Sequence, residues 1–301
     1  MPAKSQRFDE RQHMHNNTYE IFHYKDAAPK EVALHHHDFY EIYFFLAGNV
    51  QYNIESRSYS LTPGDVLLIS PMELHQPVFP QDHRSYERIV LWIDKPFLDS
   101  LGLPNQPLTT CFDTTRPNHT NLLRPDGTQR TLLNFYLDQL RQETISPEPY
   151  QDSLSLALLV QTLVMLNRLS LKASRNPETA APSDSVVYSI LSYINEHYRD
   201  DLSLDFLANK FFISKYHLSR EFNRLIGTSV HRYIIQKRLV MAKQMMTEGV
   251  SSSEVYQHCG FGDYSNFYRA FKSEYEISPK EFTARLKEIP NRRDDFARRL
   301  R

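Results

Sequence analysis

The sequence predicts an α+β protein of two domains, a β-barrel with following helices and then an all-α domain. Residues 19–93 are rich in β-branched and aromatic residues and are broken by turn signals, as in a barrel of short strands. From residue 129 onward leucines recur three and four positions apart, which is the spacing of amphipathic helices. A Pro-, Ala- and Ser-rich segment at 172–185 lacks large apolar residues and predicts a linker between two groups of helices.

These patterns also predict the limits of the parts. A chain of 301 residues has room for two domains of ordinary size. Within the first domain we expect the barrel at about 19–100 and the helices at about 129–171. The predicted parts are a first domain at 1–171, the linker at 172–185, a helical domain at 186–290 and a basic tail at 291–301.

The charge is unevenly spread, although the net charge is only −1. Residues 1–183 carry 16 basic and 21 acidic residues, whereas residues 184–301 carry 19 and 15, so only the second half suits a polyanion. The two cysteines have no paired spacing, which favours a reducing compartment. The N-terminus has no apolar core, and the apolar run at 156–166 is too short for a bilayer. We therefore expect a cytoplasmic protein that does not enter a membrane.

Two motifs in the strand-like region resemble those of cupin barrels. The first has the spacing H-x-H-x3-E-x6-G and comprises His35, His37, Glu41 and Gly48; the second comprises Gly64, Pro71 and His75. If the first strand is unbroken, alternation places His35, His37, Glu41 and Tyr43 on one side, where they converge with His75. In the segment 86–93, alternation gives one shared face to Tyr86, Arg88, Val90 and Trp92.

The helices predicted at 129–171 carry two leucine stripes. The stripes comprise Leu133, Leu137 and Leu140, then Leu154, Leu158 and Leu166. They allow two interpretations: the leucines cover the barrel, or they form a contact between two copies of the chain.

The last third of the chain contains an internal repeat. "LSREFNRLIGTSVHRYI" at 218–234 is followed 49 positions later by "FYRAFKSEYEISPKEFT" at 267–283, so that Arg220 matches Arg269 and Phe222 matches Phe271. In each copy a cap residue, Ser214 or Asp263, precedes a helix with an apolar face and a cationic face. Two short helices joined by a tight turn, the second one cationic, indicate a helix-turn-helix.

The elements around the repeat support this interpretation. Ser203 caps a first helix whose inner face is Leu204, Leu207 and Ala208; in the next helix Leu218, Phe222 and Leu225 face inward. The segment 230–249 forms a longer helix that joins the two copies. "SPKE" at 278–281 is a capping box with proline at the first helical position.

The region 186–287 resembles the DNA-binding domain of the AraC/XylS family of bacterial transcription regulators. The run G-F-x-D-x-S-x-F-x-R-x-F-K that ends in S-P is distinctive of that family. The resemblance implies that both recognition helices enter the major groove, one DNA turn apart. It assigns base reading to Tyr216, Ser219, Arg220, Ser265, Asn266, Tyr268 and Arg269. Lys215, Arg224 and Lys272 are expected to contact phosphates.

Two residues depart from the family pattern. Glu276 stands where the second helix-turn-helix of the family normally has glycine, in a position that favours a left-handed backbone. Tyr256 replaces a residue that is usually small. Both changes predict looser packing of the second helix-turn-helix.

The resemblance also implies a role for the barrel, because a cupin in front of this DNA-binding domain looks like the sensory half of the family. Such a half binds a small-molecule effector without a metal and dimerises through the helices that follow it. The ligand candidates are His35, His37, Glu41, Tyr43, His75, Arg88 and Trp92. Trp92, the only tryptophan, either stacks on a sugar or aromatic ring or belongs to the core.

The expected function is thus a DNA-binding transcription regulator, an activator by the family's common mode, with double-stranded DNA, an effector, RNA polymerase and a second copy as partners and with no cofactor. The alternative is a metal-dependent cupin enzyme of the dioxygenase or isomerase type. In that case His35, His37, Glu41 and His75 would hold Zn²⁺, Mn²⁺ or Fe²⁺. Pro29 and Glu73 stand where the cupin motifs have glycine, which weakens the alternative.

Overall fold

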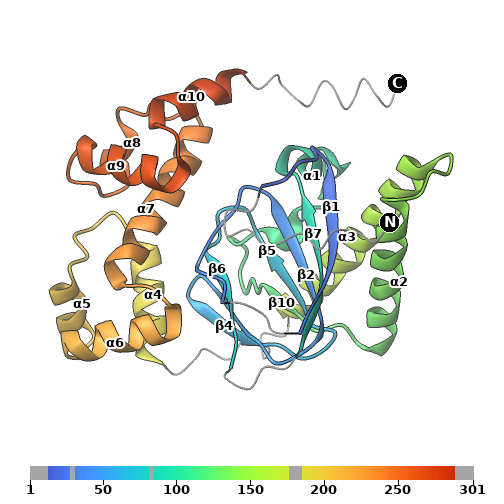
Figure 1. Ribbon diagram of the computed structural model, residues 1–301, viewed down its shortest axis with the longest axis horizontal. Coiled ribbons are helices and arrows are strands. Elements are labelled where there is room, and N and C mark those ends of the chain that lie inside the picture. The colour runs from blue at the N-terminus through green and yellow to red at the C-terminus, as the bar shows by residue number, and fades with distance from the viewer. Residues whose placement is uncertain (1–12, 28–30, 81–84, 176–184, 289–301) are drawn as a thin grey trace. The chain divides into compact units, whose positions relative to one another are not determined.

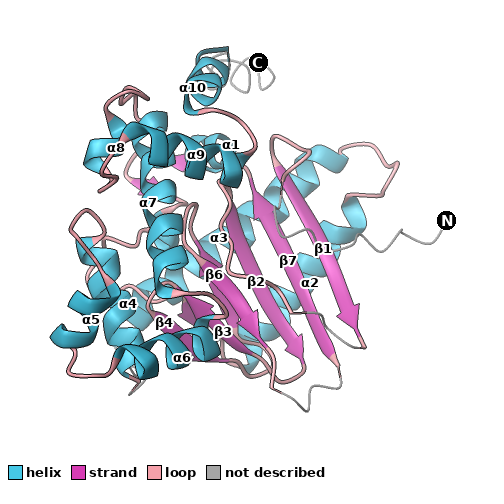
Figure 2. Ribbon diagram, turned by 60° about the vertical axis from the view of Figure 1, so that its left-hand side comes forward, coloured by secondary structure: helices cyan, strands magenta, loops and turns pink. Residues whose placement is uncertain are grey.

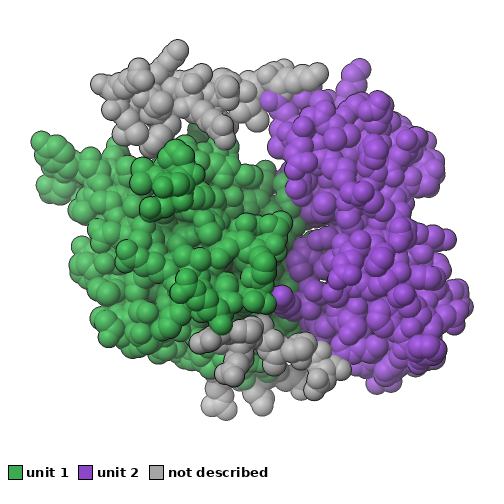
Figure 3. Space-filling view, turned by 180° about the vertical axis from the view of Figure 1, so that it is seen from behind, with its two compact units in different colours: residues 1–54, 58–181 green, residues 55–57, 182–301 purple. Residues whose placement is uncertain are grey.

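The computed structural model describes residues 13–27, 31–80, 85–175 and 185–288. The chain divides into two compact units, one of residues 1–54 and 58–181 and one of residues 55–57 and 182–301 (Figure 3). The first unit contains the β-sheets and the second is helical, which confirms the predicted α+β class. The expected tail at 291–301 and most of the expected linker lie outside the described residues.

The first unit is built on two antiparallel sheets (Figure 1). The larger sheet has the order β1-β7-β2-β5-β10, and the smaller one has the order β4-β3-β6. The strands of the larger sheet are β1 (Tyr19–Asp26), β7 (Tyr86–Ile93), β2 (Tyr40–Ala47), β5 (Val66–Ile69) and β10 (Leu122–Leu123). The smaller sheet comprises β4 (Arg57–Ser60), β3 (Gln51–Ile54) and β6 (His75–Val78).

An aromatic core fills the space between the sheets. Tyr43 and Phe45 of β2, Tyr52 of β3 and Trp92 of β7 belong to one cluster of buried residues. Tyr86, Val90 and Trp92 all lie in this cluster, so the alternation predicted for the strand 86–93 is confirmed. The segment that follows this strand was not predicted in detail; it forms α1 (Lys95–Ser100), the hairpin β8 (Gly102–Leu103) and β9 (Gln106–Pro107), and the 3-10 helix η1 (Thr110–Phe112).

Two helices pack on this unit, as the leucine spacing predicts. They are α2 (Gly127–Glu143), which Asp126 caps, and α3 (Gln151–Arg175). Five of the six stripe leucines are buried, whereas Leu154 is exposed, so the stripes cover the sheet. The predicted end at 171 is too early, because α3 continues to Arg175 and makes the first residues of the expected linker helical.

The length of α3 also corrects the prediction about its apolar run. Its 25 residues make it the one helix in the described chain that is long and apolar enough to cross a membrane. Less than half of its most apolar window is buried, and the buried residues, which include Leu159, Leu163 and Leu166, face the rest of the first unit. The core helix of a globular unit has the same composition, and the contact of α3 with α2 is of that kind.

The second unit consists of seven helices in the described chain (Figure 2). The first four are α4 (Val186–His197), α5 (Leu204–Lys210), α6 (Lys215–Ile226) and α7 (Val230–Thr247). They are followed by α8 (Val255–His258), α9 (Tyr264–Tyr275) and α10 (Pro279–Glu288). The helices α5 and α6 form one helix-turn-helix, and α8 and α9 form the other.

The long helix α7 connects the two helix-turn-helix units, as the sequence predicts. At its start Tyr233 packs edge-to-face on Phe222 of α6, with ring centroids 5.8 Å apart. Further along, Leu239 and Met246 join the cluster that contains Phe267 and Phe271 of α9. Each helix-turn-helix therefore has its own small core, and α7 contributes to both cores.

Candidate DNA-binding and effector sites

The recognition helix α6 begins at a side-chain cap and turns its polar face to solvent. Ser214 accepts a hydrogen bond from the backbone N–H of His217 at 3.2 Å. Leu218 and Phe222 are buried as predicted, but the third inward residue is Ile226 and not Leu225, which is half-buried. With this face inward, the predicted base readers Tyr216, Ser219 and Arg220 are all exposed.

The recognition helix α9 repeats this design. Asp263 caps it by accepting the backbone N–H of Asn266 at 2.7 Å, and Phe267 and Phe271 are fully buried. The predicted contact residues are again brought to one side of the helix. Ser265, Asn266, Arg269 and Lys272 are exposed, and Tyr268 is half-buried.

The two residues of the first helix-turn-helix that are expected to contact phosphates are paired with acidic residues. Lys215 forms an ion pair with Asp205 of α5. Arg224 donates to Glu221 from Nη2 at 2.7 Å and from Nε at 3.0 Å. Both pairs lie at the surface, where water and salt screen the attraction, so each pair stabilises the protein little. A phosphate can therefore replace either carboxylate at small cost.

The structure confirms that Glu276 has a left-handed backbone. Its φ and ψ are 62° and −4°, and its N–H donates to the carbonyl of Lys272. Tyr256 lies half-buried beside the second core, and its ring contacts that of Tyr264 with centroids 5.8 Å apart. The larger side chain is therefore placed at the edge of the core and not inside it.

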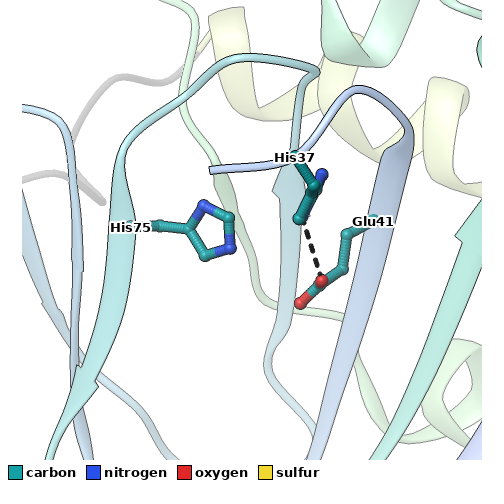
Figure 4. A group of neighbouring side chains, drawn as sticks. All are labelled: His37, Glu41 and His75. Carbon is teal, nitrogen blue, oxygen red and sulfur yellow. Dashed lines mark hydrogen bonds and ion pairs between the residues drawn. The ribbon is translucent and has the colours of Figure 1, made fainter. Parts of the chain in front are cut away.

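In the first unit, three of the predicted ligand residues meet at one end of the aromatic core (Figure 4). Donor atoms of His37, Glu41 and His75 all lie within 4.8 Å of one another. His37 Nε2 is 3.2 Å from Glu41 Oε2, and all three side chains are buried. Nε2 of His75 is buried without a hydrogen-bond partner among the described residues.

His35 lies beside this group but is not one of its three donors. The strand β2 begins only at Tyr40, so residues 35 and 37 do not continue its alternation. His35 instead forms an isolated bridge with His75, and its ring stands 4.3 Å from that of His75. Its Nδ1 is hydrogen-bonded to the carbonyl of Ala33 at 2.9 Å. Burial lowers the pKa of His35 to about 4, so the ring is neutral at pH 7.

The group of His37, Glu41 and His75 offers two nitrogens and a carboxylate, which suits a borderline ion such as Zn²⁺. The orphaned Nε2 of His75 fits such a role. Glu41, however, already accepts from Nε1 of Trp92 at 3.0 Å through the oxygen that faces His37. The same atoms are equally suited to hold the hydroxyl groups of an organic ligand.

A second polar group lies along β7. The guanidinium of Arg88 stands over the rings of Tyr24 and Tyr86, at 4.7 and 4.2 Å from their centroids. Its Nη1 donates to Asp26 Oδ2 at 2.6 Å. Tyr43 and Tyr86 share a hydrogen bond between their hydroxyls. Burial raises the pKa of Tyr86 to about 12, so both hydroxyls stay protonated at neutral pH.

Trp92 is a core residue in this structure. Its ring centroid lies 4.8 Å from those of Phe22 and Phe39, and the side chain is only 8% exposed. The indole packs against these two rings, and its N–H donates to Glu41. Stacking on a sugar therefore requires these neighbours to move.

Sequence reasoning missed Tyr24 and Asp26 of β1. They reach Arg88 because β1 pairs with β7 in a register that sets Tyr24 opposite Arg88 and Asp26 opposite Tyr86. Nothing in the local pattern of 19–26 specifies that register. The alternation of β1 would have indicated which of its side chains share a face, but not what they meet.

Two family models match the chain. The model described as an AraC-like ligand binding domain matches residues 17–112, and the model described as a helix-turn-helix domain matches residues 207–285.

The chain is also similar to curated proteins and to solved structures. Proteins described as "HTH-type transcriptional activator RhaS" from Citrobacter koseri and Escherichia coli O157:H7 are each 25% identical over 248 residues, 82% of this chain and 86% of theirs. Wild-type ToxT of Vibrio cholerae, solved with an unsaturated fatty acid, is 16% identical, with coverage of 90% and 97% and a TM-score of 0.37. The C-terminal domain of the response regulator yesN from Fusobacterium nucleatum is 32% identical, with coverage of 32% of this chain and 94% of that one and a TM-score of 0.31.

Proposed function

The chain belongs to the AraC family of bacterial transcription regulators, and from this we propose how its two parts divide the work. The helical domain at 186–290 binds double-stranded DNA in a sequence-specific way. The first unit, whose last described helix is α3, binds a small-molecule effector. Transcription of a target gene then depends on the effector, and activation is the mode we propose, as in the name of the RhaS relatives.

The observation that carries the DNA-binding proposal is the repeated exposure of an arginine on each recognition helix. Arg220 and Arg269 occupy matching positions, each six residues after a capping side chain. Arginine is the most frequent bidentate reader of guanine in the major groove. Two such readers on one chain allow recognition of two separate groove faces without a palindromic site.

The effector is proposed to bind within the first unit, where polar groups lie inside an aromatic core. His37, Glu41 and His75 form one polar group, and Tyr43, Tyr86 and Arg88 form another. Binding sites for small molecules combine apolar walls with a few such anchors. A polyhydroxylated ligand such as a sugar suits this set of donors and acceptors.

The effector controls the protein only if it favours one arrangement of the DNA-binding domains over another. We propose that the linker predicted at 172–185 accommodates the change between these arrangements; its first four residues belong to α3, and most of the rest lies outside the described residues. RNA polymerase is the proposed partner at the promoter. We also propose that the protein works in the cytoplasm, where its DNA lies.

A homodimer is proposed through the outer face of α2. Leu132 and Phe135 lie three positions apart on this helix and are 41% and 55% exposed, unlike the buried stripe leucines. Residues three apart on a helix share a face, so they form a small apolar patch. A second copy of the chain would remove this patch from water.

The group of His37, Glu41 and His75 favours a second candidate function, a metal-dependent cupin enzyme. Native mass spectrometry of the full chain, purified without chelator or added metal, separates the two functions. An organic ligand on the protein supports the effector proposal and identifies the ligand class. One divalent metal per chain supports the second candidate, and turnover by the metal-loaded protein would establish it.

A further inference from the structure

Asn266 lies in the middle of a chain of hydrogen bonds on the exposed face of α9. Its Nδ2 donates to Oδ2 of Asp263, the cap residue. Its Oδ1 accepts from Nη2 of Arg269 at 2.6 Å. The three side chains are therefore linked in one direction, with Arg269 donating to Asn266 and Asn266 donating to Asp263.

The arrangement gives Asn266 a contact with Arg269 besides the base-reading role that the resemblance implies. An asparagine recognises adenine by donating from its amide nitrogen and accepting at its amide oxygen at the same time. One amide N–H of Asn266 is used by Asp263 and one lone pair of its Oδ1 by Arg269, so one donor and one acceptor site remain. The contact with Arg269, by contrast, is already made in the protein without DNA.

Arg269 keeps the donors that guanine needs. Its Nε donates to the carbonyl of Ser265 at 3.4 Å, and one N–H of Nη2 goes to Asn266. Of the N–H donors of the guanidinium, those of Nη1 and one of Nη2 remain free for the two acceptors of guanine. The side chain is held along the helix while its reading edge stays available.

The first helix-turn-helix has no such arrangement. His217 occupies the position that matches Asn266, and its side chain is exposed. Within the described chain, neither His217 nor any other residue forms a hydrogen bond or ion pair with the guanidinium of Arg220. The two arginines thus differ in how far they are ordered before DNA arrives.

We infer that Asn266 is a positioning residue, which holds the guanidinium of Arg269 for base recognition while Asp263 fixes the amide. The inference rests on the proposed function. An ordered arginine loses less conformational entropy on binding than a free one. Arg269 should therefore discriminate its base pair more strongly than it would without Asn266.

The test uses the full chain and a pool of DNA duplexes with a randomised central segment. Base preferences are compared by sequencing the bound duplexes for wild type, Asn266→Ala, Arg269→Ala, the double variant and the matched control His217→Ala. Asn266→Ala should relax the preference at the same base pair as Arg269→Ala, by about two- to tenfold, the factor for ordering one long side chain. The double variant should resemble Arg269→Ala alone.

The control should leave the preference at that base pair as in wild type. Asn266 is exposed and alanine is a good helix former, so the thermal midpoint of Asn266→Ala should stay within a few degrees of wild type. Relaxation at a different base pair, full additivity with Arg269→Ala, or no effect of Asn266→Ala would overturn the inference. If wild type enriches no sequence, the proposed function itself fails, which is a separate result.

Discussion

Gly227 and Glu276 occupy the same left-handed position at the ends of the two recognition helices, with φ of 68° and 62°. Each donates its backbone N–H to a carbonyl four residues earlier, that of Asn223 or of Lys272. Only the first of the two is the residue type that adopts this backbone without strain. The internal repeat therefore preserves the geometry of the cap but not its glycine.

Replacing Glu276 with glycine should stabilise the second helix-turn-helix. A left-handed backbone costs a non-glycine residue about 1 kcal/mol, so Glu276→Gly should raise the thermal midpoint by a few degrees. Gly227→Ala is the matched control and should lower stability by a similar amount. A clear loss of stability in Glu276→Gly would show that the glutamate side chain contributes more than its backbone costs.

The first unit should lose stability as the pH falls below about 6.5. Burial lowers the pKa of His35 to about 4, and burial together with the neighbouring histidines holds the pKa of His75 well below its usual value. The unfolded state then binds more protons than the folded state, so the free energy of unfolding decreases by about 1.4 kcal/mol per pH unit for each such histidine. The loss begins near the unfolded pKa, and for His35 it ends near pH 4.

Urea unfolding at pH 7 and pH 5, in chelator and followed by the fluorescence of Trp92, measures this loss in the first unit. His35→Gln removes one titrating ring and should show a smaller decrease between the two pH values. An equal decrease in both proteins would contradict the linkage to His35.

Lys272 should strengthen binding to every DNA sequence alike. It is exposed on α9 and is expected to contact a phosphate, so Lys272→Ala should weaken binding to any duplex and reduce the salt slope by about one. Affinity for a random-sequence duplex at several salt concentrations measures the change. Lys172→Ala, an exposed lysine of α3, is the control with no expected effect. A changed base preference in Lys272→Ala would indicate base reading instead.

The apolar patch of α2 should govern the oligomeric state. Phe135→Glu places a charge in the proposed contact and should shift the protein from dimer to monomer in analytical ultracentrifugation. Leu171→Glu, at an exposed apolar residue of α3, tests whether any added charge has this effect. A wild-type protein that is monomeric at all concentrations, or a Phe135→Glu dimer, would remove α2 from the interface.

Local features of the helical unit could be predicted from sequence because each depends on neighbours in the chain. Ser214 and Asp263 cap helices through residues three positions on, and Ser278 and Glu281 form the reciprocal hydrogen bonds of a capping box. The choice between Leu225 and Ile226 as the inward residue was predicted wrongly. Helix periodicity leaves both near the boundary of the apolar face, and only the packing of α6 against its neighbours decides.

The polar groups of the first unit were harder to predict because they depend on strand register. Glu41 meets Trp92 because the two stand directly opposite each other in the pairing of β2 with β7. Arg88 meets Asp26 through the pairing of β1 with β7. His35 lies beside His75 but not on β2, because β2 starts after it, and a strand boundary is less clear from sequence than the strand itself.

The central claim is that Arg220 and Arg269 read DNA sequence, and the ratio of affinities for an enriched duplex and a random duplex measures it most directly. Wild type should prefer the enriched duplex by about a thousandfold or more at physiological salt. Arg220→Ala and Arg269→Ala should each lower that ratio by at least about tenfold, with unchanged thermal midpoints. A variant that keeps the wild-type ratio would contradict the claim for its helix, and a wild-type ratio near one would contradict it for the protein.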